Sequence, residues 1–169
     1  MSSRLVGCSF SFSGAATEQI TTAGGNVNNQ SAACDNTTPA LAQLTDGSGS
    51  NKAQKVGFHV FTLSTTPTDV DLTAFAGSIN DSNINFSSIK ELIIQNLDPA
   101  ISITLGNATS VTNLWTNLMG GTNVLGPQAP FIRVEHINGI PVTSNNKLLR
   151  LTAASGAPQA KVYLVGEGV

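Results

Sequence analysis

Short alternations of apolar and polar residues recur along the chain from Lys55 onward, and each of them predicts a β-strand. The alternation is clear in residues 56–63, 101–105, 132–137, 149–152 and 162–165. Pro, Gly, Asn and Asp separate these segments and are typical of turns. Short strands with turns between them favour a sandwich over a fold with crossover helices. We therefore expect an all-β fold, an antiparallel β-sandwich of jelly-roll type.

The segment Ile89–Gln95 departs from simple alternation. Its centre, Leu92-Ile93-Ile94, is apolar on both phases of a strand, which is typical of a strand covered on both faces. No charged residue follows between Pro99 and Ile132. Because a neutral surface loses its water at lower cost than a charged one, we expect that stretch to be part core and part interface.

Apolar residues in Ser110–Gly121 have helical spacing, at Val111, Leu114, Trp115 and Leu118. Ser110 suits an N-cap and the two final glycines suit a stop, whereas the Thr and Asn content gives poor helix propensity. One short helix and an irregular loop therefore both remain open. Trp115, the only tryptophan, either closes one end of the sandwich or anchors a subunit interface, where Trp is enriched.

Residues 1–44 differ in character from the rest of the chain, and we assign the sandwich domain to 45–169. Val6, Cys8, Phe10 and Phe12 alternate with small residues and predict an N-terminal strand. Residues 13–55 are rich in Gly, Asn and Ser and cannot form a packed core unaided. We expect an extended arm that becomes ordered on a neighbouring subunit; a surface loop is the alternative.

The composition limits the range of partners. Charged residues make up 11% of the chain, against about 25% in average proteins, and the formal net charge is −2. This provides no basic field for nucleic acid and no polybasic patch for a membrane surface. Low net charge favours association, so the chain fits a subunit that packs against others. A secreted or adhesin-like domain remains an alternative on composition.

The sequence contains no catalytic signature, and we expect no enzymatic activity. His59 and His136 stand in strand-like segments, and Glu135, next to His136, would point to the opposite face. Asp46–Asn51 resembles half of a calcium loop but lacks the further carboxylates and the closing Glu. We expect no metal and no cofactor.

Two cysteines, Cys8 and Cys34, do not make a disulfide framework. The Gly-rich segment between them would allow them to pair, so a bridge remains open. We expect free thiols.

The order of turns and strands after residue 44 follows a recognisable pattern. It runs through Leu44–Ala53, Asp69–Leu72, Ile84–Asn96, Ile103–Ala108, Leu148–Thr152, the Ser155-Gly156 turn and Lys161–Gly166. This pattern resembles a group of small β-sandwich virion proteins of tailed bacteriophages. The resemblance implies a structural role in the particle. The segment before Leu44 departs from the pattern, and we expect it to select the docking site.

The resemblance and the uncharged surface together predict a capsid decoration, or cement, protein that stabilises the head of the virion by subunit contacts. The expected partners are the major capsid protein or other virion proteins, together with further copies of the chain, for example in a trimer. The alternative function is a tail fibre or spike module that binds a host glycan through Trp115 or Tyr163. The candidate interface residues are Phe10, Phe12, Leu41, Leu44, Trp115, Leu118 and Phe131.

Overall fold

The computed structural model describes residues 13–21, 27–35, 44–77, 83–106, 113–114 and 122–168. The regular elements in this part of the chain are all β-strands, as the alternation predicts. The chain divides into two compact units, one that includes Leu44–Val169 and a smaller one, Cys8–Gln43. The larger unit is a two-layered β-sandwich.

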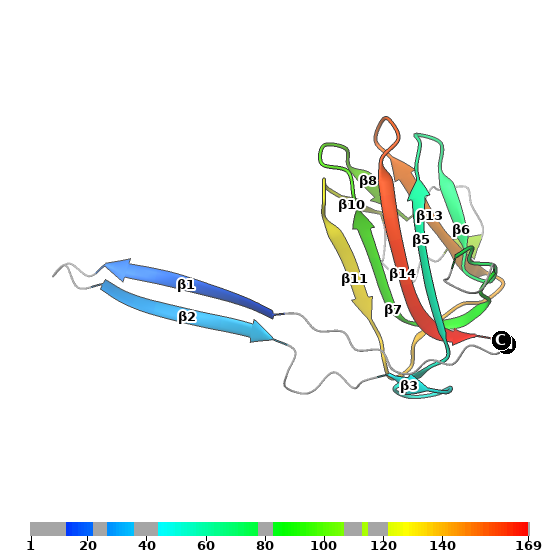
Figure 1. The fold of residues 1–169 in the computed structure, drawn as a ribbon, viewed down its shortest axis with the longest axis horizontal. Coiled ribbons are helices and arrows are strands. Elements are labelled where there is room, and N and C mark those ends of the chain that lie inside the picture. The colour runs from blue at the N-terminus through cyan, green and yellow to red at the C-terminus, as the bar shows by residue number, and fades with distance from the viewer. Residues whose placement is uncertain are drawn as a thin grey trace. The chain divides into compact units, whose positions relative to one another are not determined.

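The first layer, called here the β7 sheet, has the strand order β11-β7-β14-β5 (Figure 1). Its strands are β5 (Lys55–Thr62), β7 (Phe86–Asn96), β11 (Pro130–Val134) and β14 (Gln159–Gly168), and all neighbours are antiparallel. The short β12 (Ile140–Pro141) pairs with β7 on the same side as β11. The long strands β7 and β14 therefore form the centre of this sheet.

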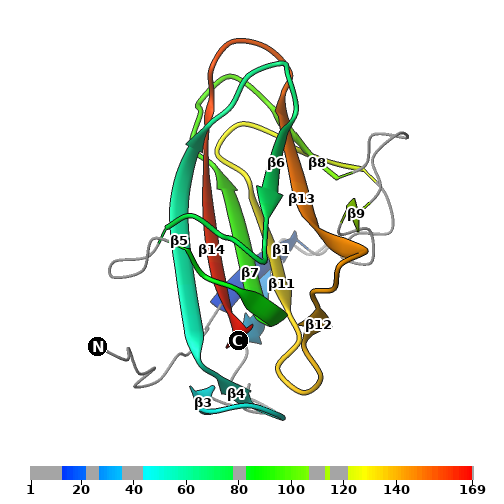
Figure 2. The ribbon, with the colours of Figure 1, turned by 90° about the vertical axis from the view of Figure 1, so that its right-hand side faces the viewer.

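The second layer, called here the β13 sheet, has the order β10-β8-β13-β6 and faces the β7 sheet (Figure 2). Its strands are β6 (Thr68–Asp71), β8 (Ile103–Leu105), β10 (Asn123–Leu125) and β13 (Asn146–Ala153). The two-residue β9 (Asn113–Leu114) pairs parallel with β13, and every other pair in this sheet is antiparallel. Two further short strands, β3 (Thr45–Asp46) and β4 (Lys52–Ala53), pair with each other.

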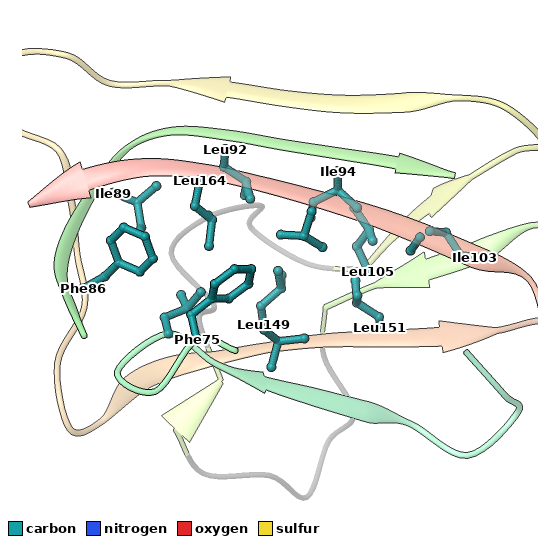
Figure 3. Close-up of a cluster of buried hydrophobic side chains, with 14 of the residues drawn as sticks. Phe75, Phe86, Ile89, Leu92, Ile94, Ile103, Leu105, Leu149, Leu151 and Leu164 are labelled. Carbon is teal, nitrogen blue, oxygen red and sulfur yellow. The ribbon is translucent and has the colours of Figure 1, made fainter. Parts of the chain in front are cut away.

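The core lies between the two sheets and consists of aliphatic and phenylalanine side chains (Figure 3). Leu92, Ile94 and Leu164 of the β7 sheet meet Leu105 and Leu151 of the β13 sheet, and all five are completely buried. Each such side chain contributes about 1.5–3 kcal/mol by its removal from water. In β8 and β13 the alternation that predicts the strand also fills this core, whereas in β5 and β11 the apolar residues Phe58 and Ile132 are exposed.

The structure confirms most of the expected strands and changes one boundary. The alternation predicts a strand through Ile137, but β11 ends at Val134. Residues 136–138 form a turn instead, in which Gly139 N donates to Glu135 O at 2.9 Å and Gly139 takes a φ of +69°, which favours glycine.

Two other expectations fall mostly outside the described residues. Of the segment 110–121, the structure describes Asn113 and Leu114, which lie in strand β9 rather than in a helix. The N-terminal strand expected over residues 6–12 lies outside the described residues.

Ion pairs join strands β6 and β13 on the second layer. Arg150 donates to both carboxylate oxygens of Asp69 at 2.6 Å, and Lys147 Nζ donates to Asp71 Oδ2 at 2.6 Å. Thr73 N donates to Asp71 Oδ1 at 2.8 Å. Burial alone raises the pKa of Asp71, but the hydrogen bonds from Lys147 and Thr73 outweigh it and leave the pKa below its ordinary value of 3.8.

Replacing Asp71 by asparagine removes the charge and retains an oxygen acceptor for Thr73. We expect D71N to lower the free energy of unfolding by about 1 kcal/mol at neutral pH. A lowered pKa stabilises the fold above the unfolded value and loses this effect as pH falls through the folded pKa. The difference from wild type in urea unfolding should therefore shrink below pH 3.8. A difference that stays constant across this range would contradict a role for the ionised carboxylate.

Candidate interface

A row of apolar side chains crosses the outer face of the β7 sheet. By strand register, Phe58 lies beside Tyr163, Tyr163 beside Ile93, and Ile93 beside Ile132. Cross-strand partners share a face, and Ile93 stands between two residues of β7 that point into the core, so all four face away from it. Phe58 is 41% exposed and Ile132 is 45% exposed. We call these four residues the outer row.

The next row of the same face is also nearly free of charge. It consists of Val60, Lys161, Gln95 and Pro130. Val60 is 37% exposed, and Lys161 Nζ lies 5.2 Å from the centroid of the Phe58 ring. An amine over an aromatic face is attracted by the ring quadrupole. The two rows together form an apolar surface with a single basic group, and contiguous exposed apolar surface of this kind marks interaction sites.

A β-bulge in strand β7 brings the side chain of Lys90 close to Glu167 and to the turn that follows β11. Val165 of β14 pairs with Glu91, but Gly166 pairs with Ile89, so Lys90 is the extra residue. A bulge changes the direction of the side chain that it carries. Lys90 Nζ donates to Ile137 O at 3.1 Å and lies 3.2 Å from Glu167 Oε1.

Glu91, the next residue of β7, contacts His136 in the turn that follows β11. Its Oε1 lies 2.7 Å from His136 Nε2, and both side chains are buried. The partner of His136 is therefore Glu91 of β7, and His136 itself lies in a turn rather than in a strand. Because taking charges out of water is costly, a buried arrangement of this kind positions a segment more than it stabilises the fold.

The turn Glu135–Gly139, called here the His136 turn, is also held by its backbone. Gly139 N donates to Glu135 O at 2.9 Å, and His136 O accepts from Asn51 N at 3.0 Å. The side chain of Ile137 nevertheless points to solvent and is 62% exposed. A turn fixed at its base thus presents one large apolar side chain.

The smaller unit contains a two-stranded antiparallel ribbon. Strands β1 (Ser13–Thr21) and β2 (Val27–Asp35) pair over nine residues each, from Ser13 opposite Asp35 to Thr21 opposite Val27. Gly14 is paired with Cys34 in this register. An isolated two-stranded hairpin is at best marginally stable in water. The ribbon therefore needs another surface to be well ordered.

Of the candidate interface residues from the sequence, the structure describes Leu44 and Phe131, and neither belongs to the outer row. Phe10, Phe12, Leu41, Trp115 and Leu118 fall outside the described residues. Leu44 is completely buried, and Phe131 is partly buried against the core. Their role at an interface stays a prediction. In the sequence, Ile93 is the residue that indicates the outer row, because it makes β7 apolar on its outer phase as well.

The described residues contain little that would bind a metal. Among them, no three His, Cys, Asp or Glu residues gather as potential ligands. The segment Asp46–Asn51 connects β3 to β4, and Gly49 N donates to Glu167 Oε1 at 2.8 Å. His59 lies in β5 next to the ring of Phe61, with 4.5 Å between the centroids. In the described part of the chain, no helix is long and apolar enough to cross a membrane.

The fold and the surface define an all-β sandwich protein with an apolar outer face. No family model matches the chain, and no curated protein matches it. Among solved structures it is similar to the "Cyanophage Pam1 capsid asymmetric unit", with a TM-score of 0.34 and 19% identity over 75% of this chain and 93% of that one. A likeness at this level does not define a family.

Proposed function

We propose that the protein is a structural subunit of a bacteriophage particle, a decoration or cement protein that stabilises the capsid by subunit contacts. The observation that carries the proposal is the two-stranded ribbon within Cys8–Gln43, which forms a unit separate from the sandwich. Such a ribbon is marginal alone but becomes ordered when it lies on another protein. A stable contact of this kind buries about 1,200–2,000 Å² in total.

The charges of the sandwich support a role in protein packing. Several of them are neutralised internally, in the pairs Lys90–Glu167, Lys147–Asp71 and Arg150–Asp69. The chain as a whole carries a net charge of −2. A surface of this kind loses its water at low cost, which suits contact with neighbouring subunits better than contact with a charged ligand.

The phage setting rests on the pattern of turns and strands from Leu44 onward, which resembles small virion sandwich proteins. The partners in this proposal are the major capsid protein, or another virion protein, and further copies of the chain. The site of action is the assembled virion. No nucleic acid or membrane takes part in the contact.

Deleting residues 1–40 tests the docking role of the ribbon. We expect the truncated chain to lose co-sedimentation with capsids that lack the protein, because the ribbon provides the contact. The sandwich should remain folded, because its core lies after residue 44. Its far-UV circular dichroism spectrum should retain the signal of β-strands. Deleting only residues 13–35 removes the two paired strands and should have the same effect.

Two outcomes would overturn the proposal. If the chain truncated at residue 40 still decorates capsids, the ribbon is not the docking element. If the full chain fails to bind capsids but binds a defined oligosaccharide on a glycan array, the protein is the fibre-type module instead.

A further inference from the structure

The His136 turn has the properties of a rigid contact element. Two of its carbonyl groups are held by the sandwich, since Ile137 O accepts from Lys90 Nζ and His136 O accepts from Asn51 N. Polar side chains beneath it contact one another, Lys90 with Glu167 and His136 with Glu91. The exposed residues of the turn are Ile137 and Asn138, and Ile137 is the apolar one that it offers to a partner. A preorganised side chain of this kind loses little entropy on binding.

The outer row has the complementary properties. It is an apolar strip across the outer face of the β7 sheet, and Phe58 and Ile132, at its two ends, are its most accessible members. Aromatic side chains dominate the energetics of such contacts, because each offers a large rigid area. Within one chain both the row and Ile137 remain open to solvent, so neither uses the other as its cover.

The charges beside the two elements are of opposite sign. Glu135 begins the His136 turn, and its side chain is half-buried. Lys161 lies next to Phe58 on the outer face and is also half-buried. The Glu135 carboxylate thus stands two residues from Ile137 in the chain, and the Lys161 amine lies 5.2 Å from the centroid of the Phe58 ring. Complementary charges of this kind set the register and the partner of a contact.

We infer that the occupant of the outer row is a second copy of this chain, whose Ile137 packs on Phe58 and its neighbour Tyr163 while its Glu135 faces Lys161. In this contact the His136 turn of one copy binds the outer row of the next, so each copy takes part in two such contacts. Head-to-tail contacts of this type close into rings or extend into filaments. The inference concerns self-association and stands independently of binding to a capsid.

The first test measures the mass of the full chain by sedimentation velocity over a wide range of concentration. We expect the wild type to self-associate. I137S and F58S should each weaken association at least about tenfold, since each removes an apolar side chain that the contact between copies buries. V124S is the matched control, because Val124 is 66% exposed on the opposite sheet. We expect V124S to associate like the wild type. Circular dichroism verifies that each variant is folded.

The second test exchanges the charges. We expect E135K and K161E each to weaken association, because each places like charges opposite one another, and the double variant to restore it. Restoration by the double variant identifies a contact between unlike patches. A monomeric wild type, an I137S variant that associates normally, or a double variant that is no better than either single one would overturn the inference.

Discussion

Replacing Gly166 by alanine should lower the free energy of unfolding of the sandwich by about 3 kcal/mol or more. Gly166 lies in β14, at the position where the bulge shifts the register with β7. A Cβ atom at this position would stand 2.1 Å from Ser88 O and 3.1 Å from Ser88 C. Both atoms belong to the sheet backbone, so relief of the clash would require separating the two central strands.

The chain offers a matched control for this substitution. A Cβ atom at Gly126 meets nothing within 4 Å, so G126A should change stability by less than about 1 kcal/mol. Urea unfolding followed by circular dichroism measures both variants. Equal midpoints for G166A and G126A would show that β7 and β14 do not approach as closely as described.

Replacing Asn96 by alanine should also cost about 3 kcal/mol of stability. Asn96 ends strand β7 and is completely buried. Its Nδ2 donates to Ile101 O at 2.7 Å and to Gly126 O at 2.9 Å, and its Oδ1 accepts from Asp98 N at 3.1 Å. Truncation to alanine leaves these backbone groups without their partner, and each unsatisfied buried group costs about 1–3 kcal/mol.

Two further variants separate hydrogen bonding from packing at this position. N96D keeps the size of the side chain but replaces the amide donor by a carboxylate that faces carbonyl oxygens, so it should be at least as destabilising as N96A at neutral pH. Q95A removes the half-buried neighbour on the outer face and should cost less than about 1 kcal/mol. If N96D unfolds at the wild-type urea midpoint, the amide donor is not what holds the two turns together.

Asn96 and Asp98 tie two loops at the same end of the sandwich. Asp98 Oδ1 accepts from Ala100 N and Ile101 N, and Asp98 O accepts from Gln128 N. The loop after β7 and the loop before β11 are therefore held by side chains of one short segment. In the sequence these residues read simply as turn chemistry, because the distant carbonyl partners cannot be inferred locally.

The candidate contact surfaces were harder to predict than the strands. In β5, Val56, Phe58 and Val60 form the more apolar phase, yet Phe58 and Val60 are exposed, so the alternation alone does not indicate which phase faces outward. Ile137 continued an apparent strand, and its exposure follows from a turn that the pattern did not predict. The buried pair of His136 and Glu91 joins a turn residue to a residue of strand β7 that is 45 positions away in the chain. Spacing within a single segment carries no information about such a pair.

The sequence by itself determined the all-β class and the core-facing phase of strands such as β8 and β13, because burial on one face of a strand imposes a period of two that is visible locally. Tertiary structure alone decided the outer row, the bulge at Lys90 and the His136 turn. These depend on which strands become neighbours and in what register, and a shift of one residue would turn every side chain to the other face. Packing between distant segments determines which strands pair and in what register, so the pattern of any single segment does not show it.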